Sequence, residues 1–384
     1  MVENDSTEFI ADPEALSSAL GNLMEPIAVD TEFHAEYRYR PRLMVIQLRD
    51  AAGRELLIDA VAIRDLRPLG AALSGRRLLL HAAISDVPLL ISRAGMAPPA
   101  PGMVADTQVL AGFAGLGFPL NLGAMLEAVL GVASSTSYGL SNWEHRPLSD
   151  EQVRYAMEDV RHLHDLAAAL DARGGPYRRL AGAAVDELLQ RELTDTDPDS
   201  IWRGFPAAEV LDARGRAILG RLMAWRERQA RAGDKPPYQI ASNAVLLDVA
   251  RRQPRSREEL LMNRKTPRGV AKRHGEHLVS VVRAVWELSP EALPASVARS
   301  PREKALERLL EAWAQAVELR DAVAARLLLP RWLKSRILAA CRVGDPAPPL
   351  AGWREPWAEE LRALLEGGRS LRIGPDGPRI EKVD

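Results

Sequence analysis

The strongest constraint on the fold of this chain is the point at which strand-like segments end. Five short apolar runs of strand character fall before residue 107, and from there onward the spacing of apolar residues is mainly helical. Polar or glycine-containing segments separate the first three runs, as in an antiparallel meander. The pattern predicts a mixed α/β sheet layer covered by helices, followed by all-helical parts. The five runs are Ile27–Phe33, Leu43–Arg49, Glu55–Asp59, Leu78–His81 and Met103–Asp106.

Helical segments and breaks divide the rest of the chain. Glycine and proline clusters interrupt the helical patterns near residue 175 and in Ser289–Pro294. Because 384 residues exceed one ordinary core, we expect two or three domains, and the breaks favour three parts. A helical pattern covers 150–170, and Gly367–Asp384 shows little periodicity, which predicts a loose tail. The predicted domain bounds are 1–192, 205–290 and 295–370.

The formal net charge of −1 conceals two halves of opposite charge. Residues 1–170 contain 13 Lys and Arg against 22 Asp and Glu, whereas residues 171–384 contain 38 against 30. The segment 205–290 is itself basic, with 17 Lys and Arg against 9 Asp and Glu. An acidic half joined to a basic half suits carboxylate chemistry delivered to a polyanion, and charge that merely varies along the chain is the alternative.

The composition argues against several classes of protein. The sequence has no run of about 20 apolar residues, which argues against a membrane span. No secretory signal is visible at its start. The single cysteine, Cys341, excludes an internal disulfide and a purely thiolate metal site. We therefore expect a cytoplasmic protein, and the sequence implies no protein partner.

Two carboxylates share one face of the first strand-like run. Asp30 and Glu32 stand two residues apart, and strand residues at this spacing project from the same face. Burying both is costly unless a cation compensates, and Mg²⁺ takes oxygen ligands of this kind. The spacing predicts a divalent-metal site, with an edge strand carrying solvated acids as the alternative.

Two further candidate positions lie outside that strand. Tyr155 and Asp159 are four residues apart in a helix whose start is marked by the capping box of Ser149 and Gln152. A phenol one turn before a carboxylate can orient a water on a metal held there, although most such pairs are surface neighbours. Asp86 follows the fourth strand near a helix start, and a carboxylate favoured there by the helix dipole is the simpler interpretation.

Taken together, these residues resemble a known family. The order Asp30-x-Glu32, Asp86 and Tyr155-x-x-x-Asp159 matches the three exonuclease motifs of the DEDD superfamily in its tyrosine branch. Neighbouring segments sharpen the resemblance toward the ribonuclease D family. It covers about residues 20–170 and implies an α/β fold of the ribonuclease H-like type. The neighbouring segments are Val29–Phe33, Arg42–Leu48, His81-Ala82, Asp106–Gln108 and Trp143–Leu148.

The resemblance also implies roles for the five motif residues. Enzymes of this family use two divalent ions, Mg²⁺ or Mn²⁺, to cleave phosphodiester bonds. Carried over by position, Asp30, Glu32 and Asp159 would ligate one ion. Asp30 would also bridge to the second ion, held by Asp86. Tyr155 would position the attacking water rather than act as a strong base, because a phenol with a pKa near 10 is mostly protonated at neutral pH.

Six more residues are candidates for substrate contact. Phe33 would stack on a terminal base, and Thr31 would contact the terminal nucleotide. A core position is the alternative for Trp143, and His81 is equally well interpreted as a packed histidine. The six candidates are Thr31, Phe33, His81, Gln108, Trp143 and Arg146.

The basic segment 205–290 resembles the HRDC domain, a helical domain that certain helicases share with ribonuclease D. Its arginines would bind phosphate without sequence preference. One departure is the loop Asn263–Gly269, where basic residues replace a glycine-rich turn. This loop would either strengthen phosphate contact or be simply solvated. Residues 295–370 resemble a second, divergent HRDC-like domain by position and helical pattern alone.

The whole resemblance implies a 3′–5′ exoribonuclease. It would act on single-stranded RNA 3′ ends, including transfer RNA precursors, and release nucleoside 5′-monophosphates. Two alternatives stay open on the residues alone. One is a 3′–5′ DNA exonuclease, because sequence does not locate a contact to the 2′-hydroxyl. The other, a catalytically silent RNA-binding protein, is disfavoured because all five motif positions are filled.

Overall fold

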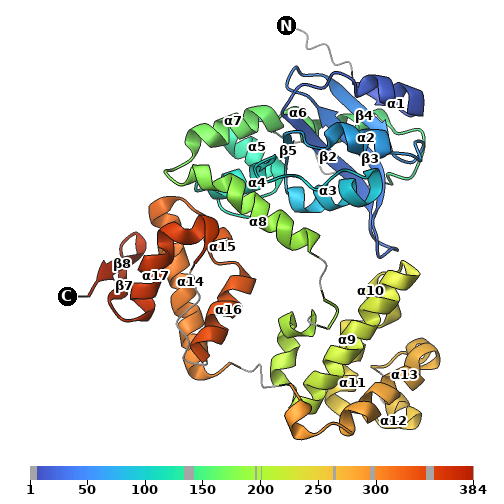
Figure 1. Ribbon diagram of the computed structural model, residues 1–384, viewed down its shortest axis with the longest axis vertical. Helices are drawn as coiled ribbons and strands as arrows, with labels where there is room; N and C mark the ends of the chain where they lie inside the picture. The colour runs from blue at the N-terminus through green and yellow to red at the C-terminus, as the bar shows by residue number, and fades with distance from the viewer. Residues whose placement is uncertain are drawn as a thin grey trace. The chain divides into compact units, whose positions relative to one another are not determined.

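The chain folds into two compact units, shown in Figure 1 as a computed structural model. One unit comprises Met1–Phe33, Leu43–Leu193 and Arg302–Asp384, and the other His34–Arg42 and Thr194–Pro301. The first residues of the domains predicted at 1–192 and 295–370 lie outside the part of the chain that the structure describes. The described residues are 7–133, 142–194, 197–199, 201–262, 265–294, 299–342 and 350–383.

The first unit is built on a six-stranded sheet with the order β1-β4-β3-β2-β5-β6. Strands β3 and β4 are antiparallel, whereas β1 runs parallel to β4, and β5 runs parallel to both β2 and β6. The predicted mixed sheet is therefore confirmed, and β1 is an additional three-residue edge strand. The strands are β1 (Glu8–Ile10), β2 (Ile27–His34), β3 (Arg42–Arg49), β4 (Glu55–Asp59), β5 (Leu78–Leu80) and β6 (Val104–Asp106).

Helices cover both faces of this sheet (Figure 1). Alternate residues of β2, β4 and β5 enter two separate apolar clusters, as the two-residue period of a strand requires. One cluster lies under α1 (Pro13–Ala19), α2 (Arg67–Leu73), α3 (Ala83–Leu89) and α8 (Ala181–Leu193). The other lies under α5 (Leu122–Leu130), α6 (Asp150–Arg161) and α7 (Leu163–Arg173). Short helical segments η1 (Leu90–Ala94), α4 (Thr107–Gly112) and η2 (Arg178–Leu180) connect these elements.

The helical pattern at 150–170 is two helices rather than one. Helix α6 ends at Arg161 and α7 begins at Leu163, with His162 between them at φ −101° and ψ 0°. The ring of His164 lies 2.8 Å from the carbonyl oxygen of Pro26 and fixes the start of α7 beside β2. Both helices bury apolar side chains in the same cluster, so a periodic sequence gives no sign of the break.

Residues 302–384 share an apolar core with the sheet unit. Trp353 packs edge-on against Phe113 at 5.4 Å between ring centroids, and the Ala324 amide donates to the Gly112 carbonyl at 2.7 Å. A Cβ atom at Gly112 would lie 2.4 Å from Leu327, so glycine allows this close approach. The helical elements are α14 (Pro301–Asp321), α15 (Ala325–Leu328), α16 (Arg331–Arg342), η6 (Gly352–Trp357) and α17 (Ala358–Leu365).

The predicted loose tail is wrong. Strands β7 (Arg369–Gly374) and β8 (Gly377–Lys382) pair as an antiparallel hairpin that ends the described chain. Alternation is weak in these strands because most of their side chains are at least partly exposed, so they carry little apolar periodicity. Among the described residues, no helix combines the length and the apolar character that crossing a bilayer requires.

Within the second unit, helices are the only regular elements among the described residues of Thr194–Pro301. Its apolar core is separate from that of the sheet unit. Side-chain caps start several of its helices, including Asp212 before α9 and Ser242 before α11. The elements are η3 (Ile201–Gly204), η4 (Pro206–Val210), α9 (Ala213–Gly233), α10 (Pro237–Ile240), α11 (Asn243–Arg252), α12 (Arg257–Leu261), α13 (Arg268–Trp286) and η5 (Pro290–Ala292).

Arg354 tests whether the C-terminal segment supports the sheet unit. Its buried guanidinium donates to the carbonyls of Leu327 and Leu328 and pairs with Glu187 of α8. We expect Arg354→Ala to lower the free energy of unfolding by about 3–5 kcal/mol, because it leaves a carboxylate and two carbonyls without their donor. Urea unfolding measures this difference. The exposed Arg362→Ala is the control, and equal stability of the two variants would contradict the expectation.

Candidate active site

Strand β2 presents two acidic residues on one face of the sheet. Its residues alternate, so Val29 points into the core beneath α1 to α3 and Ala28 into the core beneath α5 to α7. Asp30 and Glu32 continue the series of Ala28, because side chains two residues apart in a strand share a face. Both carboxylates therefore face the layer that contains α6.

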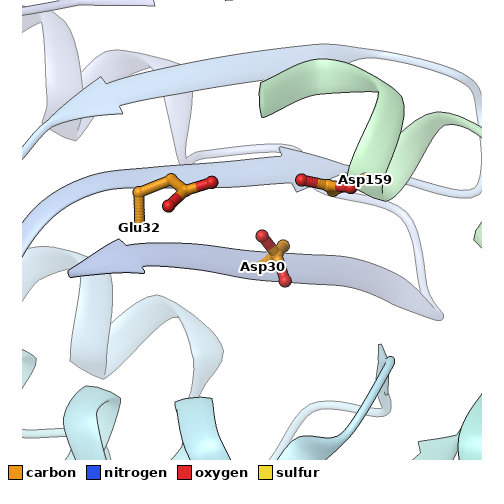
Figure 2. A group of neighbouring side chains, drawn as sticks. All are labelled: Asp30, Glu32 and Asp159. Atoms are coloured by element: carbon orange, nitrogen blue, oxygen red, sulfur yellow. The ribbon is translucent and has the colours of Figure 1, made fainter. Parts of the chain in front are cut away.

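Helix α6 supplies a third carboxylate from the opposite side. The predicted capping box is confirmed: Ser149 accepts from the Gln152 amide, and the Gln152 side chain accepts from the Ser149 amide. Figure 2 shows Asp30 and Glu32 on the strand and Asp159 on the helix, with their carboxylates toward one another. Ligand oxygens of these three half-buried residues lie within 4.8 Å of one another. The three can therefore surround one cation.

Burial and mutual repulsion raise the pKa of each of these carboxyl groups. Burial, followed by the charges of Asp86, Asp159 and Glu32, raises the pKa of Asp30 well above its usual value. Burial and Asp159 raise the pKa of Glu32 to about 8. Burial and Glu158 raise the pKa of Asp159 to about 7. A divalent cation bound among them would favour the charged forms and offset the repulsion.

Asp86 lies beside this group. It is a buried residue of α3, and the Thr31 hydroxyl of β2 donates a hydrogen bond to it. Its charge raises the pKa of Asp30, Glu32 and Asp159, which shows that the four acids are neighbours. Asp86 is nevertheless not one of the three residues with oxygens within 4.8 Å. Thr31 directs its hydroxyl to Asp86, and its predicted contact with the terminal nucleotide stays a prediction.

Asp106 holds the segment that carries Asp86. Its buried carboxylate accepts from the amides of Ala82 at 3.1 Å and Ala83 at 2.9 Å, at the start of α3, and from Gln108 at 2.8 Å, at the start of α4. These bonds hold Ala82 at φ +60°, a conformation that costs a non-glycine residue about 1–2 kcal/mol. Sequence analysis did not assign Asp106 a role, although an aspartate between a strand and a helical run marks an N-cap.

Tyr155 lies next to the acidic group on α6. Burial and the negative charges of Asp159, Glu32 and Asp30 raise the pKa of its phenol above the usual value, so it stays protonated at neutral pH. Its ring is 6.2 Å from that of Trp143, measured between centroids. Trp143 is only 1% exposed, so the structure favours the core position that was the alternative for this residue.

The guanidinium of Arg146 donates several hydrogen bonds to other groups of the protein. Nε and one terminal nitrogen donate to Asp59 at 2.5 and 2.7 Å, and further bonds reach the carbonyls of Met44, Trp143 and His145. This network ties the segment before α6 to the end of β4. A direct contact from Arg146 to RNA stays a prediction.

The other three candidates for substrate contact are partly buried. Burial lowers the pKa of His81 to about 4, so this ring is neutral at pH 7, and its Nδ1 lies 2.9 Å from the Thr107 hydroxyl. Gln108 donates to the Leu120 carbonyl at 3.2 Å. Phe33 packs at the edge of the core beneath α3. Their contacts with a substrate stay predictions.

Comparison with known proteins agrees with this arrangement. Residues 7–174 match the 3′–5′ exonuclease domain family, and residues 215–282 match the HRDC domain family. Ribonuclease D of Nitrobacter hamburgensis is 31% identical over 93% of this chain and 94% of its own length. The chain belongs to the ribonuclease D family. Ribonuclease D of Acidiphilium cryptum is likewise 31% identical, over 98% of this chain and 97% of its own length.

Solved structures support the same conclusion. The crystal structure of Escherichia coli RNase D, an exoribonuclease involved in structured RNA processing, superposes with a TM-score of 0.81 at 28% identity, over 94% of this chain and 99% of that one. The catalytic core of RRP6 from Trypanosoma brucei shares the fold, with a TM-score of 0.54 at 20% identity over 74% of this chain and 81% of that one. The predicted family and fold class, an α/β exonuclease domain followed by a helical HRDC region, are confirmed.

The raised pKa values give the stability of this ribonuclease D family member a defined pH dependence. Without metal, the folded state keeps protons on Glu32, Asp86 and Asp159 up to about pH 7–8, whereas the unfolded chain loses them near pH 4. The folded state thus binds more protons, so its stability falls as pH rises from 5 to 8. In EDTA we expect the Tm of the wild-type protein to fall between pH 5 and pH 8 by more than the Tm of Asp30→Asn falls, because that variant removes one charge from the cluster.

Adding Mg²⁺ should reverse this trend, because the cation favours the charged carboxylates. We expect Mg²⁺ to raise the Tm more at pH 8 than at pH 6 in the wild-type protein. Asp30→Asn should reduce this gain. Differential scanning calorimetry at several pH values measures both effects. Identical pH profiles with and without Mg²⁺ would contradict the assignment of a cation to this cluster.

Proposed function

We propose that this protein is a 3′–5′ exoribonuclease that hydrolyses RNA from its 3′ end and releases nucleoside 5′-monophosphates. The observation that carries the proposal is the acidic group of Asp30, Glu32 and Asp159, set within a ribonuclease D family exonuclease domain. A phosphodiester substrate is itself anionic. Such a group suits it only when cations lie between the carboxylates and the phosphate.

In this proposal two divalent ions, Mg²⁺ or Mn²⁺, bind to the group. Asp30, Glu32 and Asp159 would hold one ion, and Asp86 together with Asp30 would help to hold the other. The donor set fits, because it consists of carboxylate oxygens, which hard divalent cations prefer. Bound ions would lower the pKa of a coordinated water and neutralise charge developing on the phosphate. The bond from Thr31 fixes the orientation of Asp86 for this purpose.

Tyr155 positions the attacking water in this proposal. Its phenol stays protonated, because neighbouring carboxylates raise its pKa, so it donates or accepts a hydrogen bond without removing a proton. Its place one helical turn before Asp159 puts the hydroxyl next to a ligand of the ion that would hold the water. Trp143, packed beside the ring, limits the orientations open to the phenol.

The natural substrates we propose are single-stranded RNA 3′ ends, including those of transfer RNA precursors. Similarity to a ribonuclease D involved in structured RNA processing supports this choice. The HRDC segment supports it too, because its excess of Lys and Arg suits contact with a phosphate backbone. Under this proposal the domains predicted at 205–290 and 295–370 serve RNA binding, while 1–192 performs cleavage.

Loss of a single metal-binding carboxylate should abolish cleavage. We expect Asp30→Asn or Asp159→Asn to slow hydrolysis of a 5′-labelled RNA by at least about 10³-fold, because the bound ions contribute several kcal/mol to transition-state stabilisation. A time course in Mg²⁺ that resolves every product length measures the rate and shows the direction of digestion. RNA binding in EDTA should be largely retained.

The matched control for these variants is Glu151→Gln, an exposed acid on the same helix. It should cleave at the wild-type rate. Hydrolysis that continues in EDTA, or wild-type rates in both aspartate variants, would refute the metal-dependent mechanism. A wild-type protein that forms no product in Mg²⁺ or Mn²⁺ would identify a catalytically silent RNA-binding protein.

Removal of the Tyr155 hydroxyl should slow the reaction without affecting metal binding. We expect Tyr155→Phe to lower kcat by about 10²-fold, because a misplaced nucleophile costs that order of rate. The Mg²⁺ concentration that gives half the maximal rate should stay the same. Tyr177→Phe, at a partly buried tyrosine whose ring packs at a tilt against that of Trp357, is the control. Unchanged turnover of Tyr155→Phe would show that the hydroxyl is dispensable.

A further inference from the structure

A cavity of about 800 Å³ lies at the junction of α12 and α13 in the helical unit. Its volume is within the roughly 300–1,000 Å³ typical of ligand sites. The cavity includes described residues of the basic loop Asn263–Gly269. Asn263 and Arg264 themselves lie outside the described residues. The lining residues are Arg257, Leu261, Met262, Thr266, Pro267, Arg268, Ala271 and Lys272.

The charged side chains that line this cavity are all cations. Arg257, Arg268 and Lys272 are exposed, and the structure gives none of them an ion pair with a carboxylate of the described residues. No aspartate or glutamate is among the described lining residues. Three like charges around one concave surface repel one another, and an anion bound there would relieve that repulsion.

Helix α13 adds to the positive potential of the cavity. The helix is 19 residues long and starts at Arg268 after Pro267, which offers no side-chain cap, and its first turn contains no acid. The amides of Val270 and Ala271 donate to the Pro267 carbonyl, which leaves those of Arg268 and Gly269 to an anion, and the helix dipole favours an anion there. The Thr266 hydroxyl is buried in the cavity wall and has no hydrogen-bond partner among the described residues. A phosphate oxygen supplies the kind of acceptor that this donor lacks.

The same cavity has an apolar side. Leu261 and Met262 are 45% and 84% exposed, which is unusual for large apolar side chains beside so many cations. A sulfate or free phosphate would not use them, whereas a nucleotide has both an anionic phosphate and an apolar base face. The flexible thioether of Met262 can adapt to bases of different shape. The cavity therefore combines the two chemistries of a nucleic acid strand.

We propose that this cavity, which is far in sequence from the acidic group, binds a nucleotide of single-stranded RNA. The phosphate lies at Arg257, Arg268 and Lys272, and the base lies against Leu261 and Met262. The inference deepens the proposed function, on which it rests for the identity of the strand as RNA. Such a contact is tolerant of sequence, because cations read the backbone and an apolar surface accepts any base.

The test compares two variants of the full-length protein with the same change in charge. The cavity variant is Arg268→Gln with Lys272→Gln. The control is Lys235→Gln with Arg251→Gln, two exposed cations of the same unit that do not line the cavity. Affinity for a 20-nucleotide single-stranded RNA is measured in EDTA, so that binding is read without cleavage. We expect the cavity variant to bind about 10-fold more weakly and to lose about two counterions from the salt dependence, and the control to change little.

A third variant and a competitor separate RNA from simpler anions. Met262→Ala should weaken RNA binding without altering the salt dependence, because it removes apolar contact alone. Inorganic phosphate at the same phosphate concentration should not displace the RNA. Equal loss of affinity in the cavity and control variants, or full displacement by phosphate, would overturn the proposal. Because binding is measured without hydrolysis, failure of the exonuclease assignment would show separately, as absence of products in Mg²⁺.

Discussion

The repulsion among carboxylates at the end of β2 is the constraint on which the arrangement of the sheet unit depends. Asp30, Glu32 and Asp159 come together from a strand and a helix within 4.8 Å. Burial, and after it the charges of neighbouring acids, raises the pKa of each carboxyl group, so holding the charged forms at this place costs free energy. Such a cost persists in a fold only if the surrounding structure determines the positions of the acids. The site can then accept cations in place of protons, and the same proximity that destabilises the metal-free protein makes it a metal site.

Charged residues outside the cluster fix the positions of the elements that carry the acids. Asp106 caps α3 and α4 through three amides and thereby fixes the turn that presents Asp86. Arg146 joins the segment before α6 to Asp59 of β4 through a bidentate pair. Both contacts are paired and hydrogen-bonded, as buried charges must be. Arg146, predicted from the sequence as a substrate contact, thus has a structural role beside the site, and its contact with RNA stays a prediction.

The sequence predicted most of the sheet unit because its strands are buried and alternate in character. The strands from β2 to β6 and the capping box of α6 follow from apolar periodicity and local hydrogen bonding, which are properties of neighbouring residues. The grouping of the acids was accessible only through the family resemblance, since Asp30 and Asp159 are far apart in the chain. The Thr31–Asp86 bond was not accessible, because it depends on a tertiary neighbour that no local pattern records. The β7–β8 hairpin has a local signal in the turn sequence Gly374-Pro375-Asp376-Gly377, but its partly exposed strands lack the apolar alternation that marks a strand.

The course of the chain sets a limit on how this protein can be divided. The sheet unit is discontinuous: the chain leaves it after α8, forms the helical unit and returns at α14. The returning segment covers α4 and α8, where Trp353 meets Phe113 and Arg354 meets Glu187. This segment is connected to Asp86 through Asp106. The Asp106 side chain caps the start of α4, on which the segment packs, and also accepts from the Ala83 amide at the start of α3, the helix that carries Asp86. Residues 302–384 therefore have a role in stabilising the sheet unit that is separate from any contact they make with RNA. Deleting them would expose part of the apolar core that they share with the sheet.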